Sequence, residues 1–133
     1  MRIERVIDAA VAEAGGELFD EPPKAAETEQ FLSSPCHHLL FAYDDQTGAV
    51  IGMISGVETT HPDKGTEMFL YELGVVATAR KGGCAAELVR ALAALAKARG
   101  CYGPCCSAPP RERCSCSVGQ GSRVLRHVGR CRR

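Results

Sequence analysis

The sequence contains no long uninterrupted run of apolar residues, and this absence is the first constraint on what the protein can be. A membrane-spanning helix needs roughly 20 consecutive apolar residues, and no stretch of the 133 residues approaches that length. The N-terminal residues 1–5 carry charged side chains and lack the apolar centre of a secretion signal. Internal repeats are absent as well. We therefore expect no membrane association and a cytoplasmic location, where disulfides are uncommon.

Net charge is also absent, because 16 basic residues balance 16 acidic residues. The balance is uneven along the chain: residues 1–103 hold 15 acidic and 9 basic residues, whereas residues 104–133 hold 1 acidic and 7 basic residues. All seven of those basic residues are arginine, and five of the eight cysteines lie in the same segment. Such an asymmetry indicates two differently behaved parts. We predict one acidic domain over residues 1–103, called the body below, and a poorly ordered Arg/Cys/Pro-rich tail over residues 104–133.

The hydrophobic pattern of the body predicts strands alternating with helices, which is an α/β (α+β) arrangement. Apolar residues make up 45% of the chain and charged residues 24%, as in ordinary soluble globular proteins. One clear helix has an apolar face at helical spacing, and two short helices are separated by a Pro-Pro pair. The predicted strands cover residues 2–7, 38–43, 49–57 and 67–75, and the predicted helices lie within 8–32 and over 85–99.

A glycine-bearing turn between the last predicted strand and the clear helix is the most informative local feature. Gly82 and Gly83 allow a ligand to approach the backbone closely, and Arg80 and Lys81 add positive charge. The first N–H groups of the following helix have no partner within the helix, so the turn is suited to an anion such as a pyrophosphate. A plain connecting turn is the alternative interpretation. The sequence has neither the Gly-Lys-Ser/Thr of a Walker loop nor the G-x-G-x-x-G of a dinucleotide fold.

The residues of this unit resemble the GNAT family of N-acetyltransferases. Arg80-x-x-Gly83-x-Ala85 matches the R/Q-x-x-G-x-G/A pattern of that family, and Leu73-Gly74-Val75 is similar to its L-x-V strand end. The resemblance covers roughly residues 1–103. Segments 18–20, 37–43 and 52–75 look more specifically like the type I aminoglycoside 3-N-acetyltransferases. The resemblance implies a mixed, mostly antiparallel sheet flanked by helices.

The resemblance also implies acetyl-CoA as co-substrate. In this family the strand end binds the pantetheine arm through its backbone, and the loop amides hold the pyrophosphate. The matching positions for the arm are Leu73, Gly74 and Val75. The matching positions for the pyrophosphate are Arg80, Lys81, Gly82, Gly83, Cys84, Ala85 and Ala86.

Acidic residues supply the candidate catalytic and acceptor-binding groups. Glu72 stands where the aminoglycoside enzymes carry an acid, and we predict that it is the general base, directly or through a water. Strict alternation places Glu72 on one face of its strand together with Met68, Leu70 and Gly74. The alternative for Glu72 is a structural, salt-bridged carboxylate. Three further acidic residues are predicted to attract a polycationic amine: Glu58, Asp63 and Glu67. The alternative, at least as well supported, is that they form a solvated edge of the strands.

The tail departs from the family pattern. The family continues with a strand and a helix that carries a tyrosine, which protonates the departing thiolate. None of the three tyrosines lies in the tail, and Pro104, Pro109 and Pro110 oppose regular structure there. The tail also lacks lysine and aspartate, a composition expected when GC-rich DNA is read in a wrong frame. We therefore expect a frameshifted or truncated acetyltransferase of crippled activity, and translation of the other frames past codon 103 tests this.

A second hypothesis makes the tail a binding module rather than the remnant of an enzyme. One version is a zinc site, and the other is an Arg-rich segment that binds nucleic acid without sequence preference or binds a protein partner. The Cys-x-Cys spacing is a poor match to the usual Cys-x2-Cys. From the body we expect a small-molecule amine as partner, with no bound metal and no nucleic acid, and we leave a homodimer open. The candidate zinc ligands are Cys106, Cys114, Cys116, His127 and Cys131.

Overall fold

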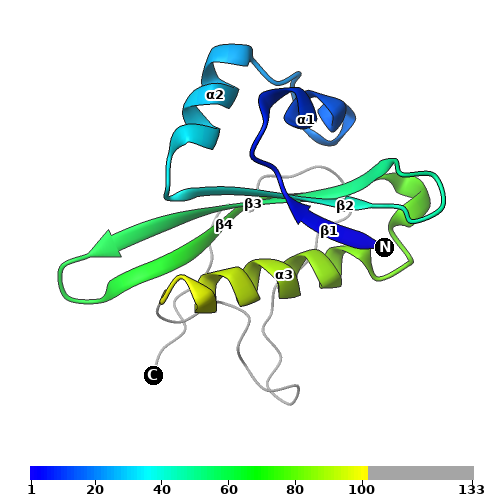
Figure 1. Cartoon of the computed structure of the whole chain (residues 1–133). Coiled ribbons are helices and arrows are strands. Elements are labelled where there is room, and N and C mark those ends of the chain that lie inside the picture. Colours follow the sequence, from blue (N-terminus) through cyan, green and yellow to red (C-terminus); the bar gives the residue numbers. More distant parts are fainter. Residues whose placement is uncertain (102–133) are drawn as a thin grey trace.

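A computed structural model of the chain describes residues 1–101 as a four-stranded sheet with helices on both faces (Figure 1). The predicted sheet, its flanking helices and their order along the chain are confirmed. The tail, where the family pattern has its final strand and helix, lies outside the described residues. No helix within the described part has the length and apolarity that a membrane span requires. The elements are β1 (Arg2–Arg5), α1 (Ala9–Ala14), η1 (Gly16–Leu18), α2 (Ala25–Ser33), β2 (His37–Tyr43), β3 (Val50–His61), β4 (Gly65–Val75), η2 (Ala77–Ala79) and α3 (Cys84–Ala98).

The sheet order is β1-β2-β3-β4, and every neighbouring pair is antiparallel. The β3–β4 hairpin is longer than predicted, because β3 continues to His61 and β4 begins at Gly65. Among the described strands, the outer ends of β3 and β4 pair only with each other, and they extend beyond β2 (Figure 1). The hydroxyl groups of Thr60 and Thr66 lie 2.8 Å apart across this end. Of the predicted loop over residues 61–65, residues 62–64 form the turn, and only the first and last residues belong to the strands.

The sheet separates two apolar cores. Helix α3 packs on one face, where Leu88 and Leu92 contact alternate residues of the strands such as Leu40 and Ile54. Helices α1 and α2 cover the other face, where Phe41 and Met53 are fully buried. Alternation along each strand explains the division, because successive side chains point to opposite faces. Figure 1 shows α1 and α2 on one side of the sheet and α3 on the other.

A β-bulge in β4 changes which of its residues share a face. Ser55 of β3 pairs with Glu72, but the next residue, Gly56, pairs with Leu70, so Tyr71 is an extra residue. Before the bulge, Leu70 packs against the α3 core; after it, Leu73 does so instead. The prediction that Met68, Leu70, Glu72 and Gly74 share one face is therefore wrong. The extra residue reverses the alternation, which turns Glu72 and Gly74 toward the side of α1 and α2.

Candidate functional site

The turn between β4 and α3 has the geometry expected of an anion-binding loop. Gly83 is the N-terminal cap of α3, and its φ of 81° lies in the left-handed region that favours glycine. Among residues 1–101, a side chain built at Gly83 would meet nothing within 4 Å, so this part of the structure leaves the space above the turn open. No side chain at the N-cap position hydrogen-bonds the first N–H groups of α3 in the described part of the chain. The structure thus supports the interpretation of an open, backbone-lined turn at a helix N-terminus.

The side chains of the loop differ in what they offer a ligand. Arg80 and Lys81 are exposed, and the Arg80 Nε donates to the carbonyl oxygen of Val75 at 3.2 Å. This bond holds the guanidinium beside the strand end. Cys84 points inward and is 2% exposed, and burial raises the pKa of its thiol. Cys84 can therefore contribute its backbone N–H but not its side chain.

The strand end that leads into this turn lies at the edge of the described sheet. Leu73, Gly74 and Val75 pair with β3 on one side. In an antiparallel edge strand, alternate backbone N–H and C=O groups point away from the sheet, where an extended ligand can pair with them. The structure therefore places the expected pantetheine-binding positions directly before the loop, on one strand–turn–helix unit.

Glu72 lies on the opposite face from α3 and is half-buried. Burial raises the pKa of its carboxyl, and the negative charge of Asp20 raises it further. The segment that carries Asp20 approaches β4 closely, because a Cβ built on Gly74 would lie 2.9 Å from the Leu18 carbonyl oxygen. A glycine at position 74 thus allows the η1 segment to rest on the strand. A half-buried carboxyl of raised pKa makes Glu72 a candidate for a functional site.

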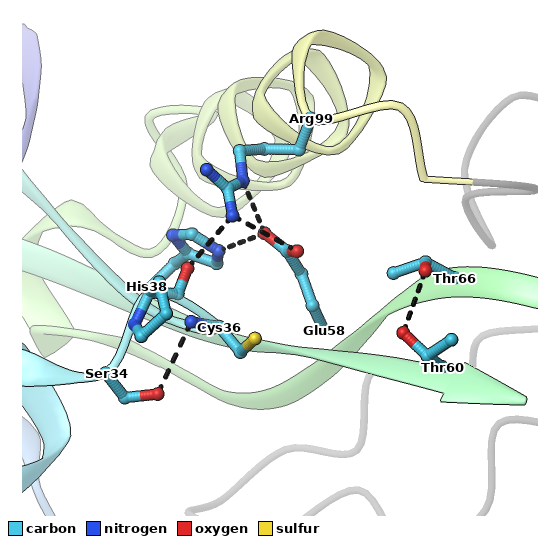
Figure 2. A network of polar contacts seen from close by, with 8 residues as sticks. Ser34, Cys36, His38, Glu58, Thr60, Thr66 and Arg99 are labelled. Carbon is cyan, nitrogen blue, oxygen red and sulfur yellow. Dashed lines mark hydrogen bonds and ion pairs between the residues drawn. The ribbon is translucent and has the colours of Figure 1, made fainter.

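Glu58 occupies a different environment from Glu72. Its carboxylate accepts hydrogen bonds from Arg99 Nε at 2.6 Å and Nη2 at 3.3 Å, and it lies 2.7 Å from His38 Nε2 (Figure 2). The same Arg99 Nη2 also donates to the Pro35 carbonyl oxygen at 3.1 Å. The side chain of Glu58 is only 8% exposed. The structure therefore places Glu58 in a polar cluster at the end of α3 rather than beside Glu72.

The protonation states in this cluster follow from its contacts. The hydrogen bond from Arg99 lowers the pKa of Glu58, and burial lowers the pKa of His38. A charged Glu58 can only accept, so the His38 proton is on Nε2. His38 Nδ1 is buried without a partner among the described residues, as a neutral ring permits. The cluster is thus an Arg–Glu ion pair with a neutral histidine beside it.

The two remaining predicted acceptor-binding acids lie on the β3–β4 hairpin. Asp63 is in the turn and is paired with His61. Glu67 is exposed and pairs with Thr59 across the hairpin. Glu58 and Glu67 point to opposite faces, because they occupy adjacent rows of the hairpin. The structure does not bring the three acids together.

Asp20 is an acid near Glu72 that sequence reasoning missed. It follows η1 in a segment without periodicity, so nothing in the sequence pattern connects it with β4. One feature of the sequence could have indicated this contact: Gly74 lies inside a predicted strand, and a glycine there often marks a place where another backbone segment comes close. The metal ligands of the zinc alternative lie outside residues 1–101. Within those residues, no group of three or more His, Cys, Asp or Glu is arranged to hold a metal ion.

The chain belongs to the acetyltransferase (GNAT) family, because the family model matches residues 3–108. None of the curated proteins matches the chain in sequence. Several solved structures share its fold. An aminoglycoside acetyltransferase, HMB0005, from an uncultured soil metagenomic sample is 24% identical with a TM-score of 0.65, and the alignment covers 76% of this chain and 74% of that one.

Two further solved structures show the range of proteins with this fold. A ribosomal-protein-alanine N-acetyltransferase from Brucella melitensis biovar Abortus 2308 is 20% identical with a TM-score of 0.63, covering 77% of this chain and 76% of that one. A second soil metagenomic aminoglycoside acetyltransferase, solved in complex with sisomicin, is 15% identical with a TM-score of 0.67, covering 76% and 72%. The predicted acetyltransferase fold is therefore confirmed.

Proposed function

We propose that the protein is an acetyl-CoA-dependent N-acetyltransferase whose acceptor is an amine of a small polycationic molecule, such as an aminoglycoside. The observation that carries the proposal is the strand–turn–helix unit. It joins a half-buried carboxyl of raised pKa at Glu72 to an open, backbone-lined turn at Gly83. Membership of the GNAT family supports the reaction class.

Three features of the turn and strand fit acetyl-CoA. The open space at Gly83 and the N–H groups of Cys84, Ala85 and Ala86 would hold the pyrophosphate, with the exposed charges of Arg80 and Lys81 beside it. The backbone of Leu73–Val75 would pair with the pantetheine arm. Acetyl-CoA supplies the acetyl group as a thioester, and its transfer to an amine forms an amide and releases the thiol.

Glu72 would remove the proton that an acceptor ammonium must lose before its nitrogen becomes a nucleophile. A general base works best when its pKa lies near the pH of the reaction, and the raised pKa of Glu72 lies closer to neutral pH than that of an ordinary glutamate. Asp20 adds negative charge on the same side of the sheet. Together with the acidic balance of the body, this charge favours a substrate with several amines.

Calorimetric titration with acetyl-CoA tests the cofactor site through two matched variants. Gly83→Glu places a carboxylate where the pyrophosphate would bind, and we expect acetyl-CoA binding to be lost. Gly65→Glu is the control, because Gly65 has a similar φ of 79° and an equally open position, but lies in the distant hairpin turn. The control should bind like the wild type. Equal binding by both variants would remove the site from the β4–α3 turn.

A further inference from the structure

Ser55 is one of two buried polar residues within residues 1–101, and the other, His38, has Glu58 as its partner. Ser55 is 6% exposed and stands in the middle of the apolar strand β3. A serine is an uncommon residue inside an apolar strand, and its Oγ is not among the fully buried side-chain atoms of residues 1–101 that lack a partner.

The strand register places Ser55 directly beside Glu72. Leu39, Ser55 and Glu72 form one row across β2, β3 and β4. Leu39 belongs to the core beneath α1 and α2, which fixes the face toward which this row points. Directly opposed residues of an antiparallel pair have Cβ atoms about 4.5–5.5 Å apart. The bulge at Tyr71 is what turns Glu72 to the face of Ser55.

We propose that Ser55 positions the reacting amine of the acceptor: its hydroxyl oxygen accepts one N–H of the ammonium while the Glu72 carboxylate accepts another. This inference rests on the proposed acetyltransferase function and adds a second residue to its acceptor site. An alkylammonium carries three N–H donors, and a hydrogen bond to the carboxylate alone leaves the ammonium free to rotate about that bond. A second acceptor on the neighbouring strand fixes the orientation of the nitrogen. The low exposure of Ser55 shields this hydrogen bond from water, which strengthens it.

Asp20 and Ser55 have different roles in this arrangement. Asp20 acts on Glu72 through charge, over a distance at which no hydrogen bond is made between them in the structure. Ser55 is neutral, so it alters the position of the amine and leaves the charge of the site unchanged. Replacement of Ser55 should therefore act on the acceptor rather than on acetyl-CoA.

Steady-state thiol release with sisomicin as acceptor tests the role of Ser55. Ser55→Ala should lower kcat/KM for sisomicin by about 10- to 100-fold, the effect of one hydrogen bond to a charged group, and should leave KM for acetyl-CoA unchanged. Ser55→Thr keeps the hydroxyl and should remain within a few-fold of the wild type. Ser33→Ala, on α2, is the matched control and should have no effect. Titration of the CoA-saturated proteins with sisomicin should show weaker binding for Ser55→Ala than for Ser55→Thr, Ser33→Ala and the wild type.

The outcomes separate the two proposals. An unchanged sisomicin kcat/KM in Ser55→Ala, with an active wild type, overturns the role of Ser55 alone. An equal loss for sisomicin and acetyl-CoA, or an equal loss in Ser55→Ala and Ser55→Thr, assigns Ser55 a packing role and also overturns it. A wild-type protein that neither binds acetyl-CoA nor releases thiol overturns the proposed function, and the role of Ser55 with it.

Discussion

Replacement of Gly74 by alanine tests whether the η1 segment must rest on β4 for the proposed acceptor site around Glu72 to form. The Cβ of Gly74→Ala would lie 2.9 Å from the Leu18 carbonyl oxygen and 3.6 Å from Met53 Cγ. The nearer contact is a backbone atom, which cannot swing away as the end of a side chain can. Either the segment that carries Leu18 and Asp20 or the end of β4 must shift by several tenths of an ångström.

This contact sets the expected loss in the free energy of unfolding of Gly74→Ala. Overpacking by one methyl group against rigid neighbours destabilises proteins by about 1–3 kcal/mol. In a domain of 60–100 residues, each kcal/mol lowers Tm by roughly 4–8 °C. We expect Gly74→Ala to show this loss in urea denaturation. We also expect a raised KM for the amine acceptor, because Asp20 is carried on the displaced segment.

Gly16→Ala provides the matched control for this prediction. Gly16 lies in η1, close in sequence to Leu18, but the one described atom within 4 Å of a Cβ there is Pro23 Cδ, at 3.9 Å. This substitution should be neutral, or stabilising by up to about 1 kcal/mol through the entropy of the unfolded chain. Equal stability of Gly74→Ala and Gly16→Ala would refute the close-approach argument. So would a Gly74→Ala protein with unchanged KM for the acceptor.

The remaining predictions concern protonation and the tail. The pKa of Glu72 is raised in the folded protein, so its contribution to stability is fully present at a pH below its ordinary pKa and is lost as the pH rises through the raised pKa. The Glu72→Gln variant should therefore unfold at a higher urea concentration than the wild type at pH 8 and at the same concentration at pH 4. Its rate of thiol release should fall by about 10²–10⁴-fold. The pKa values of His38 and Glu58 are lowered in the folded protein, so these two groups stabilise the fold at a pH above their ordinary pKa values of 6.5 and 4.5. Urea denaturation at pH 7, 5.5 and 4 should therefore show a progressive loss of stability. The stability of Glu58→Gln should fall less steeply with pH in the acid range than that of the wild type. A chain in which residues 104–133 are replaced by the translation of another frame should release thiol from acetyl-CoA at least about 10²-fold faster, because it regains a general acid; equal rates would mean that the tail completes the active site.

The sequence by itself determined the local elements and the glycine-bearing turn before α3. The apolar face of α3 and the Gly82-Gly83 turn are properties of consecutive residues, and both lie where the pattern predicted them. Strand alternation also follows from consecutive residues, but in β4 it holds only up to the bulge at Tyr71. The hairpin length was underestimated, because its outer end is polar and has no core to produce a hydrophobic pattern. Local patterns predict local structure because they depend on periodicities of 2.0 and 3.6 residues.

Only the tertiary structure decided which side chains share a face with Glu72. The bulge at Tyr71 comes from strand pairing, and it reversed the face expected for Glu72. Ser55 and Asp20 are far from Glu72 in the sequence, and register and the close approach at Gly74 bring them to it. Glu58, in turn, meets Arg99 across 41 residues. Such contacts depend on how the elements pack, which the periodicity of a single segment does not encode.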